Sequence, residues 1–306
     1  MPRRDIEFKN GVGITLRGWL YTPDGVSPSE ELPCLVMVHG FGAVKEMTLP
    51  TIADHFVSNL KLAVLVYDNR GYGASDAGEG QPRNEAIPYD QVSDFSDAIT
   101  YAQSLSEVDS TRIGIWGSSF SGGHAITVAA GDRRVKAVIS QVPFMHGWET
   151  VRRLIRADFM GGLEAAFEAD RQARAAGQPG IMIPLIDPNP LAQSAIPLPD
   201  GHAFYDTWLK DLPHLENKVT ARSMEVMRTY IPANVIEYVS PTPLWMSVAE
   251  RDTLTPTDCT LKAFASALEP KKLVILKGGH FDAYSGPNLE RLLIEQTEFL
   301  KNTLLA

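Results

Sequence analysis

One short stretch of the chain, residues 112–123, constrains the fold more than any other. Its apolar run Ile113–Trp116 predicts a buried strand that stops abruptly at Gly117. A helical pattern over Phe120–Ala130 begins almost at once, and Ser119 occupies the turn between the two. Small residues two positions before and after this serine let strand and helix approach closely. The arrangement is typical of a nucleophile elbow, a strained turn that exposes a serine hydroxyl beside a helix N-terminus.

The elbow pattern leaves alternatives open. Glycine is usual where this chain has Ser121, and the stretch can also be aligned with Ser118 or Ser121 as the nucleophile. Ser119 is preferred because the Gly122-Gly123 pair then lies where the helix packs on the strand. A serine before a helix can equally be an N-cap without any catalytic role. This motif alone therefore does not separate catalysis from capping.

Length and composition indicate a globular protein with a full core. The chain has 306 residues, 44% hydrophobic and 21% charged, which fits one large α/β domain or one domain with an insertion. Its formal net charge of −9 argues against nucleic acid or an anionic membrane as a partner. Cys34 and Cys259 are expected to be buried free thiols without metal-ligand spacing. The N-terminus has no apolar signal core, so a cytoplasmic location is expected.

Strand and helix patterns alternate along most of the chain. An Asn10-Gly11 turn predicts a β-hairpin built from residues 5–9 and 14–21. Further strands are predicted at residues 34–38, 63–67, 135–142, 243–248 and 272–276. Helices are predicted at residues 49–60, 92–105, 256–268 and 287–305. Strands that are apolar on both faces and separated by helices indicate a parallel sheet covered on both sides.

Residues 144–235 break this alternation. Residues 148–176 have a helical pattern, and residues 215–230 are expected to be helical again. Between them, Pro179 to Pro213 is too rich in proline for a long helix or a central strand. Because the whole segment is too long for a simple loop, we predict a cap over the strand ends. The predicted parts are a core at 1–143, the cap at 144–235 and the rest of the core at 236–306.

Polar residues follow two of the later strands, at the edge where open parallel sheets form their sites. Asp252 comes after the strand at 243–248, and His280 comes after the last strand. A serine hydroxyl needs a base within hydrogen-bond reach, and that base needs an orienting carboxylate. Serine, then aspartate, then histidine is one known chain order of such a triad. We therefore predict Ser119 as the nucleophile, His280 as the base and Asp252 as the orienting acid.

Other residues compete for these roles. Glu250 and Asp258 are alternative acids, and Asp252 is favoured because it follows its strand directly, although an aspartate there can also simply cap a turn. His39 also ends a strand, but Gly-Phe-Gly follows it, so we expect it to shape that turn. The remaining histidines are expected to be surface or packing residues: His55, His124, His146, His202 and His214.

Two backbone N–H groups, those of Phe41 and Phe120, are predicted to form the oxyanion hole. Phe41, Phe120, Met145 and Trp148 lie near the expected mouth of the site. They predict an apolar acyl pocket, with Met145 and Trp148 as substrate contacts. Side chains of this kind are more often part of the core than in contact with a ligand.

Taken together, these residues resemble those of α/β-hydrolases. The resemblance spans nearly the whole chain and rests on His39-Gly40-Phe41-Gly42, Asp68-x-Arg70-Gly71-x-Gly73-x-Ser75, Gly117-x-Ser119-x-Ser121-Gly122, Asp252 and Gly279-His280. It implies an α/β fold with an eight-stranded, mostly parallel sheet and an antiparallel second strand. Helices would cover both faces, and a helical, proline-rich cap would be inserted after the sixth strand.

Residues 116–124 and 231–243 resemble, more loosely, the dienelactone-hydrolase and X-prolyl-peptidase-like branch. That branch includes polyketide-pathway thiohydrolases and acyltransferases, which take acyl chains from carrier proteins. Dienelactone hydrolases proper use a cysteine where this chain has Ser119.

The sequence thus predicts a serine hydrolase that cleaves an ester, thioester or lactone without a metal or organic cofactor. The expected partner is a small acyl substrate, which a carrier protein could present; a homodimer stays open. Three alternatives remain: an acyltransferase with the same triad, an amidase or peptidase, and a non-catalytic binding protein. Epoxide hydrolase or dehalogenase chemistry would need an acidic residue in place of Ser119.

Overall fold

The computed structural model describes residues 3–27, 30–189 and 191–306. Residues 1–2 of the N-terminal segment and Pro190 of the proline-rich stretch lie outside this range. The described residues form an eight-stranded sheet with the order β1-β2-β4-β3-β5-β6-β9-β10. Strand β2 runs antiparallel to both of its neighbours, and the other pairings are parallel. The predicted hairpin, the mostly parallel sheet and the antiparallel second strand are confirmed.

The strands of this sheet are β1 (Arg3–Lys9), β2 (Thr15–Tyr21), β3 (Leu32–Val38), β4 (Ala63–Tyr67), β5 (Val108–Ser118), β6 (Val135–Gln141), β9 (Leu244–Ala249) and β10 (Lys271–Leu276). The helices that flank it are α1 (Leu49–Asn59), α2 (Pro88–Gln103), α3 (Phe120–Gly131), α8 (Thr257–Ser266) and α9 (Gly286–Lys301). Helix α2 begins four residues before the predicted start. Pro88 occupies its first turn, where the missing N–H of proline costs no hydrogen bond.

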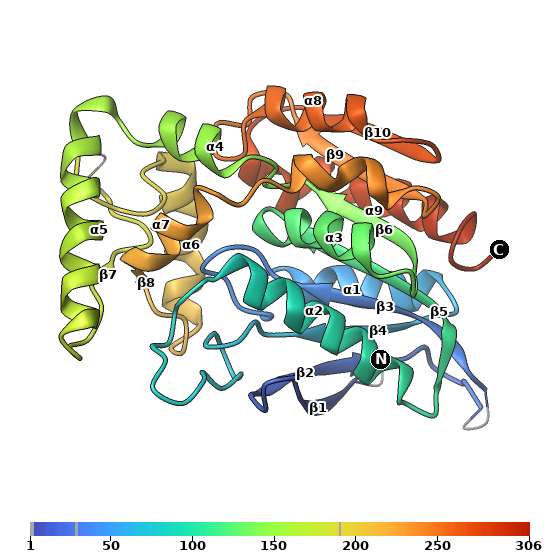
Figure 1. The fold of residues 1–306 in the computed structure, drawn as a ribbon. Helices are drawn as coiled ribbons and strands as arrows, with labels where there is room; N and C mark the ends of the chain where they lie inside the picture. The colour runs from blue at the N-terminus through green and yellow to red at the C-terminus, as the bar shows by residue number, and fades with distance from the viewer. Residues whose placement is uncertain (1–2, 28–29, 190) are drawn as a thin grey trace.

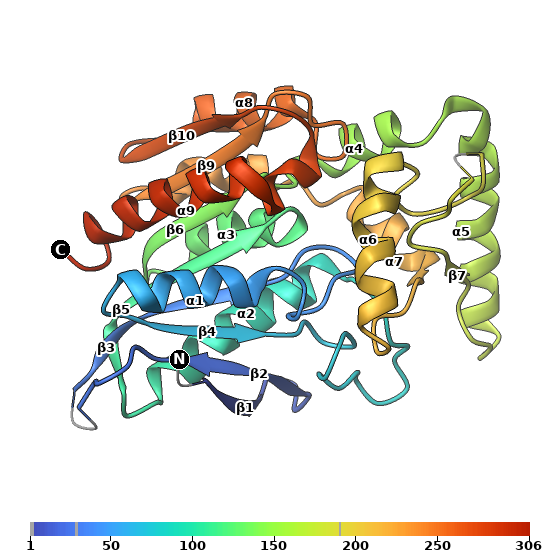
Figure 2. The same cartoon turned by 180° about the vertical axis from the view of Figure 1, so that it is seen from behind.

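Helices cover both faces of the sheet, as predicted. One apolar cluster joins the strands to α2, α3 and α8, and a second joins them to α1 and α9. Figure 1 shows the first group of helices in front of the sheet, and Figure 2 shows the second group from behind. Every residue of β3 and β4 is buried, which explains why these strands are apolar throughout instead of alternating.

Residues 147–227 form a separate lobe beyond the carboxyl ends of the strands (Figure 1). Its elements are α4 (Gly147–Leu154), a 3-10 turn (Ala157–Phe159), α5 (Met160–Ala175), β7 (Met182–Ile183), α6 (Pro199–Asp211), β8 (Val219–Thr220) and α7 (Ala221–Met227). The 3-10 helix that follows, Pro232–Val239, returns to the core and packs against α3 and α8. We call the part from α4 to α7 the cap. Its apolar cluster also contains Phe120 and Tyr72 of the core, so the cap packs directly on the elbow.

Two expectations for this segment were wrong. The proline-rich stretch contains the 13-residue helix α6, because no proline lies between Pro199, in its first turn, and Pro213. The predicted helix over residues 215–230 shrinks to α7, because Val219–Thr220 pairs instead with Met182–Ile183 as a two-stranded ribbon. The prolines predict where helices are interrupted in this segment, but they do not predict the structure of the residues between them.

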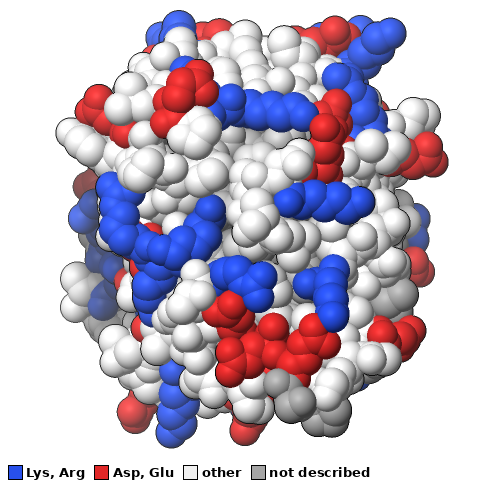
Figure 3. Space-filling view, turned by 90° about the vertical axis from the view of Figure 1, so that its right-hand side faces the viewer, with Lys and Arg blue, Asp and Glu red and all other residues white. Residues whose placement is uncertain are grey.

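Surface charge and hydropathy add two observations. The face of the molecule opposite the cap carries Lys and Arg interspersed with Asp and Glu, so the net negative charge does not form a single field there (Figure 3). Within the described residues, every helix is too short or too polar to cross a bilayer.

Candidate active site

Ser119 lies on a turn as strained as the elbow motif predicts. Its φ is 58° and its ψ is −120°, a conformation that non-glycine residues rarely adopt. The turn is tight because β5 and α3 almost touch: a Cβ atom on Gly117 would lie 2.0 Å from the carbonyl oxygen of Ser121. Only glycine fits at position 117, and the predicted strained conformation is confirmed.

The three candidate serines differ in their hydrogen-bond partners. The Ser121 hydroxyl is buried and donates to the carbonyl oxygen of His39, while the Ser118 hydroxyl pairs with the hydroxyl of Tyr284 at 2.7 Å. The Ser119 side chain makes no capping bond to α3. Its Oγ instead lies 3.0 Å from Nε2 of His280. The geometry therefore favours Ser119 over its neighbours and over a simple capping role.

His280 connects Ser119 to Asp252. Its Nδ1 lies 2.8 Å from Oδ2 of Asp252, so an Nδ1–H tautomer donates to the carboxylate and leaves Nε2 free to accept from Ser119. The His280 and Asp252 side chains are both buried. The 3-10 turn His280–Tyr284 after β10 and the loop after β9 place these two groups side by side. The predicted set of three residues is thus brought into one hydrogen-bonded line.

Asp252 is held in place by the turn that follows it. Its Oδ1 accepts the backbone N–H groups of Leu254 and Thr255 at 3.0 and 2.7 Å. Its Oδ2 accepts the Thr255 hydroxyl at 2.9 Å, in addition to His280. The carboxylate is therefore fully hydrogen-bonded although it is buried, as a buried charge requires.

The alternative acids lie elsewhere. Asp258 forms an ion pair with Arg153 of α4 at 2.5 Å, and this pair lowers the pKa of Asp258 to about 2. Glu250 is exposed and accepts a long 3.4 Å bond from the backbone N–H of Gly278. Neither carboxylate hydrogen-bonds His280.

The loop after β3 comes close to Ser119. A Cβ atom on Gly40 would lie 3.2 Å from Cβ of Ser119, so glycine allows this approach. The rings of Phe41 and Phe120 contact each other edge to face, with centroids 5.5 Å apart. Within the described part of the chain, the N–H groups of both phenylalanines have no hydrogen-bond acceptor. Two free donors thus flank the site, as the predicted oxyanion hole requires.

Core and cap both hold this loop. Buried Asp68, which follows β4, accepts the Lys45 backbone N–H and the Lys45 ammonium group, each at 2.7 Å. From the cap, the Tyr205 hydroxyl of α6 donates to the carbonyl oxygen of Phe41 at 2.6 Å. Leu185 of the cap packs against Gly42 so closely that a Cβ atom there would lie 2.6 Å from its Cδ1. The conformation of the loop therefore depends on both parts of the molecule.

His39 serves this turn structurally, as we expected. Its Nδ1 contacts the carbonyl oxygen of Gly40 at 2.9 Å, and its Nε2 accepts the backbone N–H of Asn69 at 3.0 Å. Burial lowers its pKa, so the ring is neutral near pH 7. His124 is also buried and neutral, with a pKa lowered to about 3, and it contacts Tyr230 and Gln91. Both are packing residues with satisfied ring nitrogens.

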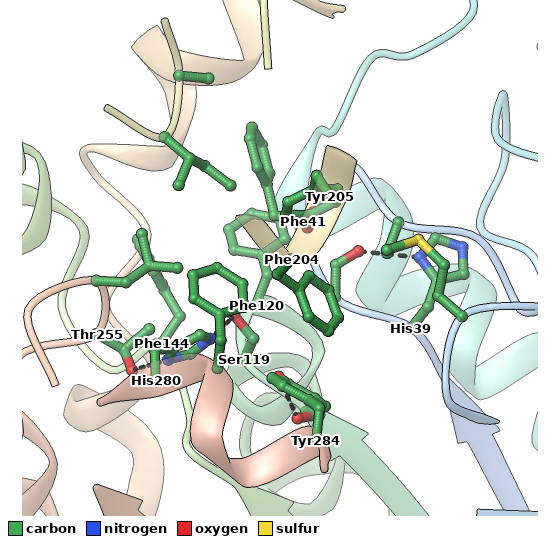
Figure 4. A pocket seen from close by; sticks show the side chains of 18 of the residues that line it. His39, Phe41, Ser119, Phe120, Phe144, Phe204, Tyr205, Thr255, His280 and Tyr284 are labelled. Carbon is green, nitrogen blue, oxygen red and sulfur yellow. Dashed lines mark hydrogen bonds between the residues drawn. The ribbon is translucent and has the colours of Figure 1, made fainter. Parts of the chain in front are cut away.

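Ser119 and His280 lie at the base of a largely apolar cavity between core and cap (Figure 4). Phe41, Phe120 and Phe144 line it from the core side. Cap side chains close it from above: Thr150, Leu154, Ala195, Ile196, Phe204, Tyr205, Met224 and Met227. The arrangement can hold an apolar acyl group against a serine that has a base and two oxyanion donors beside it.

Neither Met145 nor Trp148 lines this cavity, so the two predicted substrate contacts are corrected. The chain places Phe144 in the cavity, and the next residue, Met145, is buried in the apolar cluster that joins the sheet to α2, α3 and α8. Helix α4 turns Thr150 and Leu154 inward, which leaves Trp148 about half exposed on the surface. The hydrophobic pattern of a sequence predicts which side chains are buried. It does not predict which of the buried side chains line a ligand cavity.

Several residues of the site were missed from sequence. Thr255 had a signal, because an aspartate followed by threonine three residues later is a common turn in which the carboxylate accepts nearby backbone N–H groups. Tyr205 and Tyr284 had none. They reach the site from α6 and from the turn after β10, and their positions depend on tertiary packing.

Comparison with known proteins agrees with the fold. The alpha/beta hydrolase family profile matches residues 35–290. A thiohydrolase of Eupenicillium brefeldianum is 33% identical, over 98% of this chain and 94% of that protein. A polyketide transferase of a Penicillium species is 34% identical, over 98% of this chain and 97% of that protein. The crystal structure of the alpha/beta hydrolase GrgF from Penicillium sp. sh18 is similar over 100% of both chains, with a TM-score of 0.82 and 32% identity. The chain therefore belongs to the alpha/beta hydrolase family.

Proposed function

We propose that this protein is a serine hydrolase that cleaves an ester, thioester or lactone through an acyl-enzyme on Ser119. The observation that carries the proposal is the line of hydrogen bonds from Asp252 through His280 to Ser119, at the base of an apolar cavity. A resemblance of fold would not suffice, because one fold hosts many functions.

In the first half-reaction, Oγ of Ser119 attacks the acyl carbonyl carbon while Nε2 of His280 takes its proton. The carbonyl oxygen becomes an oxyanion that accepts the N–H groups of Phe41 and Phe120. Asp252 stabilises the imidazolium and keeps the ring oriented. The tetrahedral intermediate collapses when His280 gives its proton to the leaving oxygen or sulfur, which leaves the acyl group on Ser119.

In the second half-reaction, a water molecule replaces the leaving group. His280 takes a proton from this water, and the resulting hydroxide attacks the acyl-enzyme. The same two N–H groups donate to the second oxyanion. Proton return from His280 to Oγ of Ser119 releases a carboxylic acid and restores the enzyme.

The relatives support acyl chemistry and favour a second candidate as well. Two similar proteins are named thiohydrolases, whereas several others are named polyketide transferases or acyltransferase. Transfer needs only that an alcohol or amine take the place of water in the second half-reaction. A transferase with the same acyl-enzyme is therefore the alternative proposal.

Active-site labelling tests the shared first step. A fluorophosphonate probe should modify the peptide that contains Ser119, as read by mass spectrometry. Ser119→Ala should abolish labelling, whereas Ser118→Ala should still be labelled at Ser119. Labelling of a neighbouring serine, or none in a folded protein, would contradict the proposed nucleophile.

Partition of one acyl donor distinguishes hydrolysis from transfer. Purified enzyme is given acyl N-acetylcysteamine thioesters, which imitate the end of a carrier-bound thioester, with and without added alcohols or amines. A hydrolase releases the acid whatever acceptor is present. Ester or amide formation that rises with acceptor concentration, at the expense of the acid, would instead identify a transferase.

A further inference from the structure

A second cavity lies inside the cap, beside the one that contains Ser119. Side chains of α4 and α5 and of residues 183–197 line it, and most of them are apolar, among them Ile155, Leu163 and Ile183. Its two charged wall residues, Arg156 and Asp158, pair with each other at 2.7 Å. The cavity therefore offers no uncompensated charge and suits a neutral, largely apolar ligand.

The two cavities share one wall. Leu154, Ala195 and Met224 line both of them. Ala195 is the smallest of the three, and methionine is unbranched and adapts its shape readily. A chain that enters from Ser119 would therefore have to pass only a short partition of apolar side chains to reach the cap cavity.

Each cavity also has one buried hydroxyl without a partner. Thr150 lines the first cavity and Ser194 lines the second, and they are 3% and 4% exposed. Neither hydroxyl hydrogen-bonds any described residue. A buried polar group that stays unpaired is destabilising, and most such groups in proteins have a partner. Two orphaned hydroxyls along one apolar path point to a ligand that brings oxygen atoms with it.

We propose that the cap cavity binds the distal part of a long acyl chain that carries hydroxyl or keto oxygens, with Ser194 as the hydrogen-bond partner of one of them. The proposal rests on the proposed function, because the acyl carbonyl is placed at Ser119. It names the substrate class: chains too long for the first cavity and oxygenated along their length. Short acyl groups would use the first cavity alone.

Chain-length profiles of matched variants test the first part of the proposal. Acetyl, butanoyl, octanoyl and dodecanoyl N-acetylcysteamine thioesters are compared by kcat/KM. Ala195→Phe fills the shared wall, and Ala192→Phe narrows only the cap cavity. Ala203→Phe makes the same change on an exposed site of α6 and serves as the control.

We expect Ala192→Phe, which leaves the first cavity untouched, to keep acetyl turnover within about twofold and to lose about tenfold or more on the dodecanoyl substrate, as the loss of several buried methylenes predicts. Ala195→Phe changes both cavities, so its readout is the ratio of dodecanoyl to acetyl kcat/KM, which should fall by about tenfold or more. The control should leave the whole profile unchanged. An equal loss at every length, or none, would overturn the distal site. If Ala192→Phe fails to fold, an unchanged ratio of dodecanoyl to acetyl kcat/KM in Ala195→Phe would overturn the distal site in the same way.

Ser194→Ala tests the oxygen contact. Dodecanoyl thioesters with one hydroxyl at successive carbons are compared with the plain chain. Wild type should prefer at least one hydroxylated isomer by about tenfold, and Ser194→Ala should lose that preference without losing activity on the plain chain. An unchanged preference would mean that water alone satisfies Ser194. Absence of turnover on all chains, together with no labelling of Ser119, would mark failure of the proposed function and not of the distal site.

Discussion

At the scale of single residues, the orientation of the Asp252 carboxylate depends on Thr255. Thr255 supplies two of the hydrogen bonds that fix the carboxylate, one from its hydroxyl and one from its backbone. Thr255→Val removes only the hydroxyl and keeps the shape of the side chain. We expect kcat to fall by about tenfold, because the lost bond served a buried carboxylate and costs about 1–3 kcal/mol.

Thr260→Val is the matched control for that prediction. Thr260 is equally buried and lies on α8 close by, but its hydroxyl donates to the carbonyl oxygen of Pro143, away from His280. It should lower the free energy of unfolding in urea without changing kcat. Equal effects of the two variants on kcat would show that Thr255 only stabilises the fold.

The chain order of Ser119, Asp252 and His280 sufficed to predict which residues would meet, because strand ends converge on one sheet edge. Their mutual distances needed the structure. Met145 and Trp148 show the limit: each lies within a few residues of a true lining residue, yet a shift of one position turns a side chain away from the cavity. Which side chains line the cavity depends on such shifts, whereas Ser119, Asp252 and His280 can be recognised from motifs.

At the scale of elements, helix α6 positions the loop that carries Phe41. Tyr205→Phe removes the bond to the Phe41 carbonyl oxygen but keeps the buried ring. A looser loop would place its N–H donor less well against the oxyanion, so kcat should fall by up to about tenfold while KM changes little. Tyr238→Phe, at an exposed tyrosine outside the cavity, should change neither. A rise in KM alone would assign Tyr205 to substrate binding.

A second contact between elements, the Arg153–Asp258 pair, joins α4 of the cap to α8 of the core. The hydrogen bond from Arg153 lowers the pKa of Asp258 to about 2, below its value of about 3.9 in an unfolded chain. A depressed pKa means that the pair stabilises the fold above about pH 4 and loses this effect as the pH falls toward 2.

Asp258→Asn should therefore lower the free energy of unfolding at pH 7 by at most about 1 kcal/mol, because the pair is exposed to solvent. Urea unfolding at several pH values and salt concentrations checks this. The difference from wild type should shrink toward acid pH and at high salt. A difference that persisted in both conditions would mean that the carboxylate stabilises by packing and not by charge.

The core elements were predictable because each strand and helix carries its own periodic pattern. Helix α6 was not predictable, since the prolines around it suggested an irregular stretch. The ribbon of β7 and β8 was not predictable either, because each of its strands is only two residues long. Cap elements bury their apolar faces partly against one another and partly against the elbow. Such long-range packing leaves a weak local signal in the sequence.

At the scale of the whole molecule, cap and core share one apolar cluster. It contains Phe120 and Phe144, which line the cavity with Ser119, together with side chains of α5, α6 and α7. The cap would expose this surface if it opened as a unit, so its local stability cannot be much below that of the core. We therefore predict a single cooperative unfolding transition for the whole chain.

Two probes check this cooperativity. Trp208 of α6 is only partly buried in the cap, and Trp245 is buried in β9. Variants whose single tryptophan is Trp208 or Trp245 report by fluorescence on the cap or on the core, respectively. Circular dichroism reports on both parts together. All three urea curves should coincide, with the same midpoint and the same slope. An earlier transition at Trp208 would instead describe a cap that opens alone, and substrates would then enter by its movement and not through a fixed path.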